Sequence, residues 1–193
     1  MRITRVAPVS LGYRKTDPPM MRSFALVRVE TDTGLVGWGE ASTNWGHSYP
    51  TVFAAAIRDV CAPILVGREP REVRSRLTDL RTRMDGYLGW DGFTSQVIAA
   101  VEIALWDILG KALEKPVYEL LGGKVHERLR SYTYLYPYFD RGEHAYSPSK
   151  VYSDPDAAAQ RALKYVEEGF TAVKFDPAGA YSTFDPRQPS LEA

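Results

Sequence analysis

Residues Ala99–Gly123 read A-A-V-E-I-A-L-W-D-I-L-G-K-A-L-E-K-P-V-Y-E-L-L-G-G. In and just before this stretch, apolar side chains recur at steps of three and four residues: Val97, Val101, Leu105, Ile108 and Ala112. This spacing predicts a helix from Gly92 to about Leu113 that packs one stripe of side chains against a core. Pro116 and the pair Gly122–Gly123 are expected to close the helical region.

The residues before this helix favour antiparallel strands followed by helices. Alternating apolar residues predict strands at 23–30 and 35–41, joined by a turn that contains Asp32, Thr33 and Gly34. Residues 1–10 are expected to add a third strand. Residues 12–22, with the Pro18–Pro19 pair, are interpreted as a loop.

Two more helices are expected between this sheet and Gly92. The first begins at about Thr51, and Pro63 is expected to bend or end it. The second runs from Glu69 to about Met84. The single cysteine, Cys61, lies in the apolar run of the first of these helices, so no internal disulfide can form.

The character of the chain changes after the glycine pair. Residues 129–136 and 171–176 read as strands, and residues 157–168 between them favour a helix with Asp154 as its N-cap. Strand, helix and strand in this order predict a βαβ unit with parallel strands. Only two strands are available, so this part cannot form a complete α/β domain.

The overall composition is typical of a water-soluble globular protein, with 45% hydrophobic and 25% charged residues. The 24 basic and 24 acidic residues balance, which gives no general attraction to nucleic acid or to an anionic membrane. We found neither an apolar signal core nor a run of about 18 apolar residues. We therefore expect a cytoplasmic protein with a small-molecule partner, no nucleic-acid partner and no membrane association.

The helix Ala99–Gly123 closely resembles the signature helix of the mandelate racemase and muconate lactonizing group of the enolase superfamily. Residues at the family's spacing are Glu102, Ala104, Asp107, Gly110, Lys111, Pro116, Leu120 and Gly122. The segment G-W-G-E-A at 37–41 resembles the family's strand after the first hairpin, and V-K-F-D at 173–176 lies where the family carries its Lys-x-Lys type motif.

The resemblance implies a fold of two parts. Residues 1–125 would form an α+β capping domain, and residues 126–193 would open an α/β domain, a TIM-like (β/α) barrel. Because such a barrel usually takes about 250 residues, we expect the chain to be the N-terminal portion of a longer enzyme.

The resemblance also implies an activity, the abstraction of a proton next to a carboxylate. Mg²⁺ would steady the enediolate intermediate, with its acidic ligands on barrel strands beyond Ala193. A carbon acid of this kind ionises readily only where a cation and fixed donors meet the new negative charge. A homo-oligomer is implied as well.

Lys174 and Asp176 are the candidate catalytic residues. They lie two positions apart near the end of a strand, so both project from the same face, toward the end where barrel active sites are built. The family's second lysine is replaced by Asp176, and a carboxylate, with a reference pKa of roughly 3.9, is a poor base. We therefore favour dehydration of an acid sugar, with a histidine and aspartate on later strands taking the proton.

The early loops supply candidate substrate-binding residues, since in this family the capping domain covers the barrel mouth. These candidates are Arg14, Lys15, Trp45 and His47, together with Tyr136 after the first barrel strand. Two alternatives stay open: an epimerase, racemase or cycloisomerase of the same superfamily, or a non-catalytic capping module that binds a small acid or a partner. A structural ion pair remains the alternative interpretation of Lys174 and Asp176.

Overall fold

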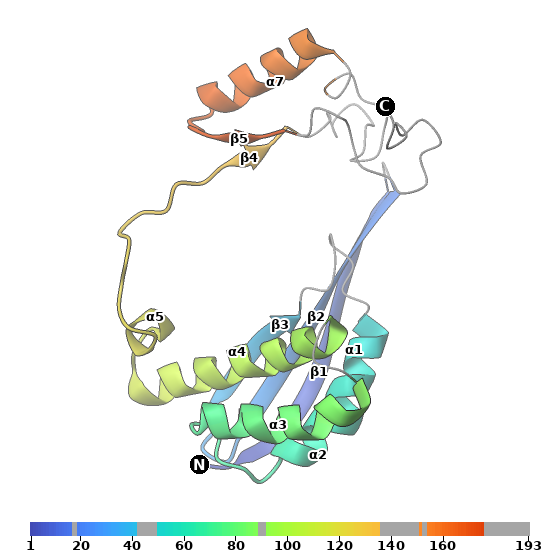
Figure 1. Ribbon diagram of the computed structural model, residues 1–193, viewed down its shortest axis with the longest axis vertical. Coiled ribbons are helices and arrows are strands. Elements are labelled where there is room, and N and C mark those ends of the chain that lie inside the picture. Colours follow the sequence, from blue (N-terminus) through green and yellow to red (C-terminus); the bar gives the residue numbers. More distant parts are fainter. Residues whose placement is uncertain (17–18, 42–49, 89–91, 136–150, 152–153, 176–193) are drawn as a thin grey trace. The chain divides into compact units, whose positions relative to one another are not determined.

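The computed structural model describes residues 1–16, 19–41, 50–88, 92–135, 151 and 154–175 (Figure 1). The chain divides into two units. The first comprises Met1–Lys15 and Pro19–Val125, and the second comprises Thr16–Pro18 and His126–Ala193.

The first unit is built on a three-stranded sheet with the order β1-β2-β3. The strands are β1 (Ile3–Thr16), β2 (Pro19–Thr31) and β3 (Val36–Ala41). β2 and β3 are antiparallel, with partners running from Ala25↔Ala41 to Glu30↔Val36. Gly34 in the turn between them has φ +83°, a conformation that glycine adopts without the clash a Cβ would cause. The predicted hairpin is confirmed.

The first hairpin is longer than the sequence predicted. Residues 12–22 were interpreted as a loop, but β1 continues to Thr16 and β2 begins at Pro19. Arg14 and Lys15 therefore belong to a strand. The prolines misled the interpretation, because the first residue of a strand is a position where a missing N–H group is tolerated.

The first helical segment passes through Pro63 instead of ending there. It consists of α1 (Pro50–Ala56), a π-helical turn (Ile57–Cys61) and α2 (Ala62–Leu65). In the π turn the N–H of Ala62 donates to the carbonyl of Ile57, five residues back. We attribute this widened turn to Pro63, whose ring would clash with the carbonyl four residues earlier in a regular α-helix.

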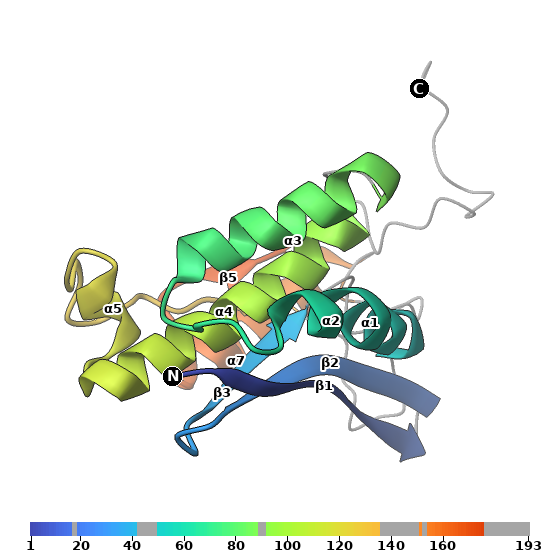
Figure 2. The ribbon, with the colours of Figure 1, turned by 90° about the horizontal axis from the view of Figure 1, so that it is seen from below.

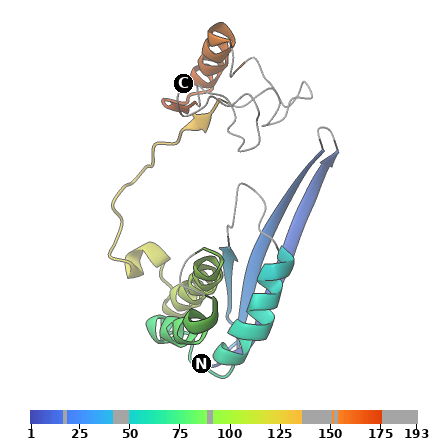
Figure 3. The same cartoon turned by 45° about the vertical axis from the view of Figure 1, so that its right-hand side comes forward.

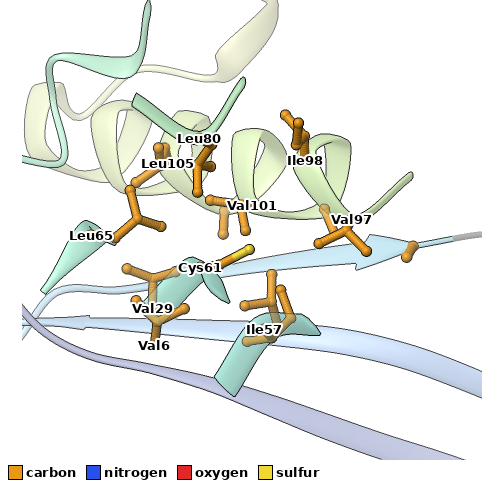
Figure 4. Close-up of a cluster of buried hydrophobic side chains, with 14 of the residues drawn as sticks. Val6, Val29, Ile57, Cys61, Leu65, Leu80, Val97, Ile98, Val101 and Leu105 are labelled. Atoms are coloured by element: carbon orange, nitrogen blue, oxygen red, sulfur yellow. The ribbon is translucent and has the colours of Figure 1, made fainter. Parts of the chain in front are cut away.

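The remaining helices of the first unit are α3 (Val73–Leu88), α4 (Phe93–Leu113) and the short α5 (Val117–Leu120). The helices lie on one side of the sheet (Figure 2). The core between these layers draws on every one of these elements except α5, and its central side chains are shown in Figure 4. Each large apolar side chain buried there contributes about 1.5–3 kcal/mol.

Two glycines of β3 let the backbone of α4 approach the sheet closely. A Cβ at Gly39 would lie 1.9 Å from the carbonyl oxygen of Ala100, and one at Gly37 would lie 2.1 Å from that of Ala104. No side chain fits in such a space. The G-x-G pattern of β3 and the small residues of α4 therefore form one contact surface.

The second unit contains β4 (Thr133–Tyr134), α7 (Pro155–Glu167) and β5 (Val173–Lys174). β4 and β5 are parallel, which confirms the predicted βαβ arrangement. The carboxylate of Asp154 accepts hydrogen bonds from the backbone N–H groups of Asp156 and Ala157, so the predicted N-cap is confirmed. Among the described residues, the strands are shorter than the predicted ranges 129–136 and 171–176.

Candidate functional site

Lys174 lies opposite Tyr134 in the parallel strand pair. The register pairs Tyr134 with Lys174 and Thr133 with Val173. Because neighbouring strand residues alternate between the two faces, Tyr134 and Lys174 share one face. The Lys174 ammonium nitrogen lies 5.7 Å from the centroid of the Tyr134 ring, within the range of a cation–π contact. The Lys174 side chain is exposed among the described residues.

The register of the two strands is fixed on both sides of this pair. The N–H of Leu135 donates to the carbonyl of Lys174 at 2.9 Å, and the N–H of Thr133 donates to that of Ala172 at 3.3 Å. The Arg130 guanidinium donates to the hydroxyl of Thr171 at 2.9 Å and also to the carbonyl of Thr171. A one-residue slip would break these bonds and turn Lys174 to the other face.

Helix α7 connects the two strands of the pair along the chain. Helix α7 lies along β4 and β5 in both views that show them clearly (Figures 1 and 3). Leu135, which alternates with Tyr134, is buried, and so is Ala158 on α7. Tyr165 and Phe170 make an edge-to-face contact with ring centroids 5.9 Å apart where the helix returns to β5. Val173, which alternates with Lys174 on β5, is 40% exposed, so the face opposite Lys174 is covered only in part.

Most other predicted site residues lie outside the described part of the chain. Asp176, Trp45, His47 and Tyr136 belong to this group. Arg14 and Lys15 are placed in β1 by their backbone, but their side chains are outside the described part. The roles proposed for all of these residues stay predictions.

Tyr134 was missed by sequence reasoning, which considered the later tyrosines. The predicted strand 129–136 was the available signal, since a period of two along it would place residue 134 on the same face as residues 132 and 136. Which of these tyrosines meets Lys174 depends on the register between β4 and β5, which the sequence does not encode locally.

The described residues do not provide a Mg²⁺ site. No group of three or more His, Cys, Asp or Glu side chains among them could hold a metal ion. Mg²⁺ prefers carboxylate and other oxygen ligands, so this part of the chain does not fit the metal, and no chemical step is assigned to a metal here.

Two acidic residues of α4, Asp107 and Glu102, make structural contacts. The Asp107 carboxylate pairs with the Lys111 ammonium at 2.7 Å and accepts a hydrogen bond from the backbone N–H of Trp38 at 2.9 Å. Glu102 accepts from the indole Nε1 of Trp106 at 3.4 Å. These contacts join α4 to β3 or stay within α4.

Within the part of the chain that the structure covers, none of the helices has the length and apolar character needed to cross a membrane.

Comparison with known proteins identifies the family. The profile of the mandelate racemase / muconate lactonizing enzyme N-terminal domain matches residues 4–122, which is more than half of the chain. The chain belongs to this family, and its first unit is the family's α+β capping domain.

The similar curated proteins are named as sugar-acid dehydratases. A D-xylonate dehydratase from Haloferax volcanii is 35% identical over 154 residues, which are 79% of this chain and 33% of that protein. A D-gluconate dehydratase from Thermoproteus tenax is 32% identical over 177 residues, which are 92% of this chain and 32% of that protein. The chain thus spans about a third of the length of these relatives.

Solved structures give the same family assignment. A mandelate racemase/muconate lactonizing enzyme from Sulfitobacter sp. is 35% identical, with a TM-score of 0.74, and the match covers 100% of this chain and 46% of that one. A 3,6-anhydro-D-galactonate cycloisomerase from Zobellia galactanivorans is 27% identical, with a TM-score of 0.70, covering 91% of this chain and 42% of that one.

Proposed function

We propose that the intact protein is a lyase that removes the proton next to a carboxylate and dehydrates an acid sugar. The exposed Lys174 ammonium, held in register on β5 of the parallel strand pair, is the observation that carries the proposal. The dehydratase names of the similar curated proteins support it. Residues 126–193 are proposed to open the barrel, with residues 1–125 as its cap.

The chemistry proposed for Lys174 is electrostatic. Removing a proton next to a carboxylate places further negative charge on an anionic group, and a fixed cation nearby lowers the free energy of that state. An ammonium group on a strand end meets this need, because the strand fixes the side chain's origin. Asp176 is proposed to lie beside it at the edge of the carboxylate site.

Substrate selection is proposed to involve Arg14, Lys15, Trp45, His47 and Tyr136, on the basis of sequence alone. When bound, Mg²⁺ would supply stabilisation of the enediolate, with ligands expected after Ala193. We also propose that the intact protein is a cytoplasmic homo-oligomer and that it binds neither nucleic acid nor a membrane.

A cycloisomerase or epimerase is the second candidate activity. The similarity to the 3,6-anhydro-D-galactonate cycloisomerase favours it, because that structure covers nearly the whole of this chain. A non-catalytic capping module that binds a small acid is the candidate from another class.

The test is an assay of the intact protein with Mg²⁺ against a panel of sugar acids. We expect a 2-keto-3-deoxy acid from at least one of them, and a large loss of rate in Lys174→Ala. Lys164→Ala is the matched control, because Lys164 is an exposed lysine on α7 that lies outside the proposed site.

Other outcomes separate the alternatives. Exchange of the substrate's α-hydrogen with solvent deuterium, without net loss of water, would favour an epimerase over a dehydratase. If the protein gives no product and no deuterium exchange with any acid of the panel, that result contradicts the proposed lyase activity.

A further inference from the structure

The Lys174 ammonium lies over the ring of Tyr134 in a cation–π contact. The nitrogen lies 5.7 Å from the ring centroid, and the two residues are direct partners in the parallel ladder. Tyr134 is half-buried, whereas Lys174 is exposed. The ring is therefore the better-fixed member of the pair.

A lysine side chain has four rotatable carbons, so a free ammonium at a strand end samples many positions. Contact with the electron-rich face of an aromatic ring favours the positions above that ring. The partner cannot shift along β4, because the hydrogen bonds of Leu135 and Thr133 to β5 fix the register. The backbone thus determines which ring meets this ammonium.

We propose that Tyr134 is a positioning residue, whose ring holds the Lys174 ammonium where the substrate carboxylate is to bind. This inference rests on the proposed function. It assigns to Tyr134 a role that acts through Lys174, by preorganising its charge. The role belongs to the ring, and the phenol hydroxyl is dispensable for it.

The chain offers matched variants. Tyr134→Phe keeps the ring and removes the hydroxyl, while Tyr134→Leu removes the ring and keeps an apolar side chain. Tyr132→Leu is the control, because Tyr132 is an exposed tyrosine two residues before Tyr134. Circular dichroism of each intact variant verifies that it is folded.

The first experiment detects the contact between Lys174 and Tyr134 by NMR and does not require that the protein be enzymatically active. Lysines of the intact protein are reductively methylated with ¹³C, and the Lys174 methyl resonance is assigned by its loss in Lys174→Arg. We expect an upfield ring-current shift that persists in Tyr134→Phe and Tyr132→Leu and disappears in Tyr134→Leu. A Lys174 resonance that is the same in Tyr134→Leu and in the unsubstituted protein would overturn the inference.

The second experiment is kinetic. A cation–π contact in such a site corresponds to about a 3- to 30-fold effect, so we expect Tyr134→Leu to lower kcat/KM by this factor. The Tyr134→Phe and Tyr132→Leu variants are expected to stay within about twofold of the unsubstituted protein. Equal losses in Tyr134→Phe and Tyr134→Leu would assign the effect to the hydroxyl and overturn the role of the ring.

The two experiments separate the inference from the proposed function. If the unsubstituted protein dehydrates no sugar acid, the proposed function fails, while the resonance still decides whether Tyr134 holds Lys174. If the protein is active but Tyr134→Leu keeps its full rate, Tyr134 is not a positioning residue although the proposed function stands.

Discussion

The side chain of Asp107 completes the hydrogen bonding of Trp38, which lies 69 positions away on the outer strand of the sheet. Its carboxylate accepts from the Trp38 N–H at 2.9 Å, and its partner Lys111 donates to the carbonyl of Val36 at 2.7 Å. In the sheet formed by the described residues β3 is an edge strand, so these backbone groups have no neighbouring strand there to bind. Two signature residues of the helix thus occupy part of an open sheet edge.

This arrangement predicts that Asp107→Ala destabilises the first unit more than the loss of an ordinary surface ion pair. The Trp38 N–H loses its acceptor and the Lys111 ammonium loses its carboxylate partner while it keeps the Val36 carbonyl, so we expect a loss of about 1–2 kcal/mol in the free energy of unfolding, measured by urea denaturation. Lys115→Ala, which removes an exposed ion pair with Glu119, is the control and should change little. Equal effects of the two substitutions would contradict the structural role of Asp107.

The close approach of β3 and α4 predicts a severe effect of Gly39→Ala. A methyl group there would lie 1.9 Å from the Ala100 carbonyl oxygen, so the helix has to move away from the sheet. We expect a loss of about 3 kcal/mol or more, or failure to fold, by thermal denaturation. Glu40→Ala, the next residue but on the exposed face, should stay within about 0.5 kcal/mol. A stable Gly39→Ala protein would show that the two layers are not in backbone contact.

Glu114 is a position where substitution should stabilise the protein. It follows the last residue of α4 with φ 52°, and it is the one non-glycine with positive φ among the described residues. Left-handed backbone is strained for residues with a Cβ, so Glu114→Gly should raise stability by about 0.5–1 kcal/mol. Glu114→Val should lower it, since β-branched residues fit this conformation poorly. Melting temperatures that shift in the same direction for both variants would contradict this explanation.

The ionisation of Glu69 is expected to make the stability of the first unit depend on pH. Hydrogen bonds from Arg71 lower the pKa of its carboxyl to about 2, from an ordinary value of 4.5. Because the folded protein holds the carboxylate charged, its stabilising contribution is complete above pH 4.5 and declines as pH falls toward 2. Glu69→Gln should therefore be less stable than the unsubstituted protein at pH 7 and nearly equal to it at pH 2, by urea denaturation. A difference that stays constant between these pH values would rule out this titration as its cause.

The local features of the fold could be read from the sequence because they depend on neighbouring residues. The stripe from Val97 to Ala112 sets the buried side of α4, Gly34 permits the turn, and Asp154 caps α7. The interpretation of the Pro18–Pro19 pair as a loop was less successful. Pro19 begins a strand, because the cost of proline depends on whether its backbone position needs a hydrogen-bond donor.

The sequence by itself determined the type and period of the main elements and the spacing of the family's signature residues, since these follow from local backbone geometry. Tertiary structure alone decided which distant groups meet. Asp107 binds the N–H of Trp38 because α4 lies on the glycines of β3, and Lys174 meets Tyr134 because one particular register joins β4 and β5. Such pairings depend on how whole elements pack, and a pattern within one segment carries no record of its partner.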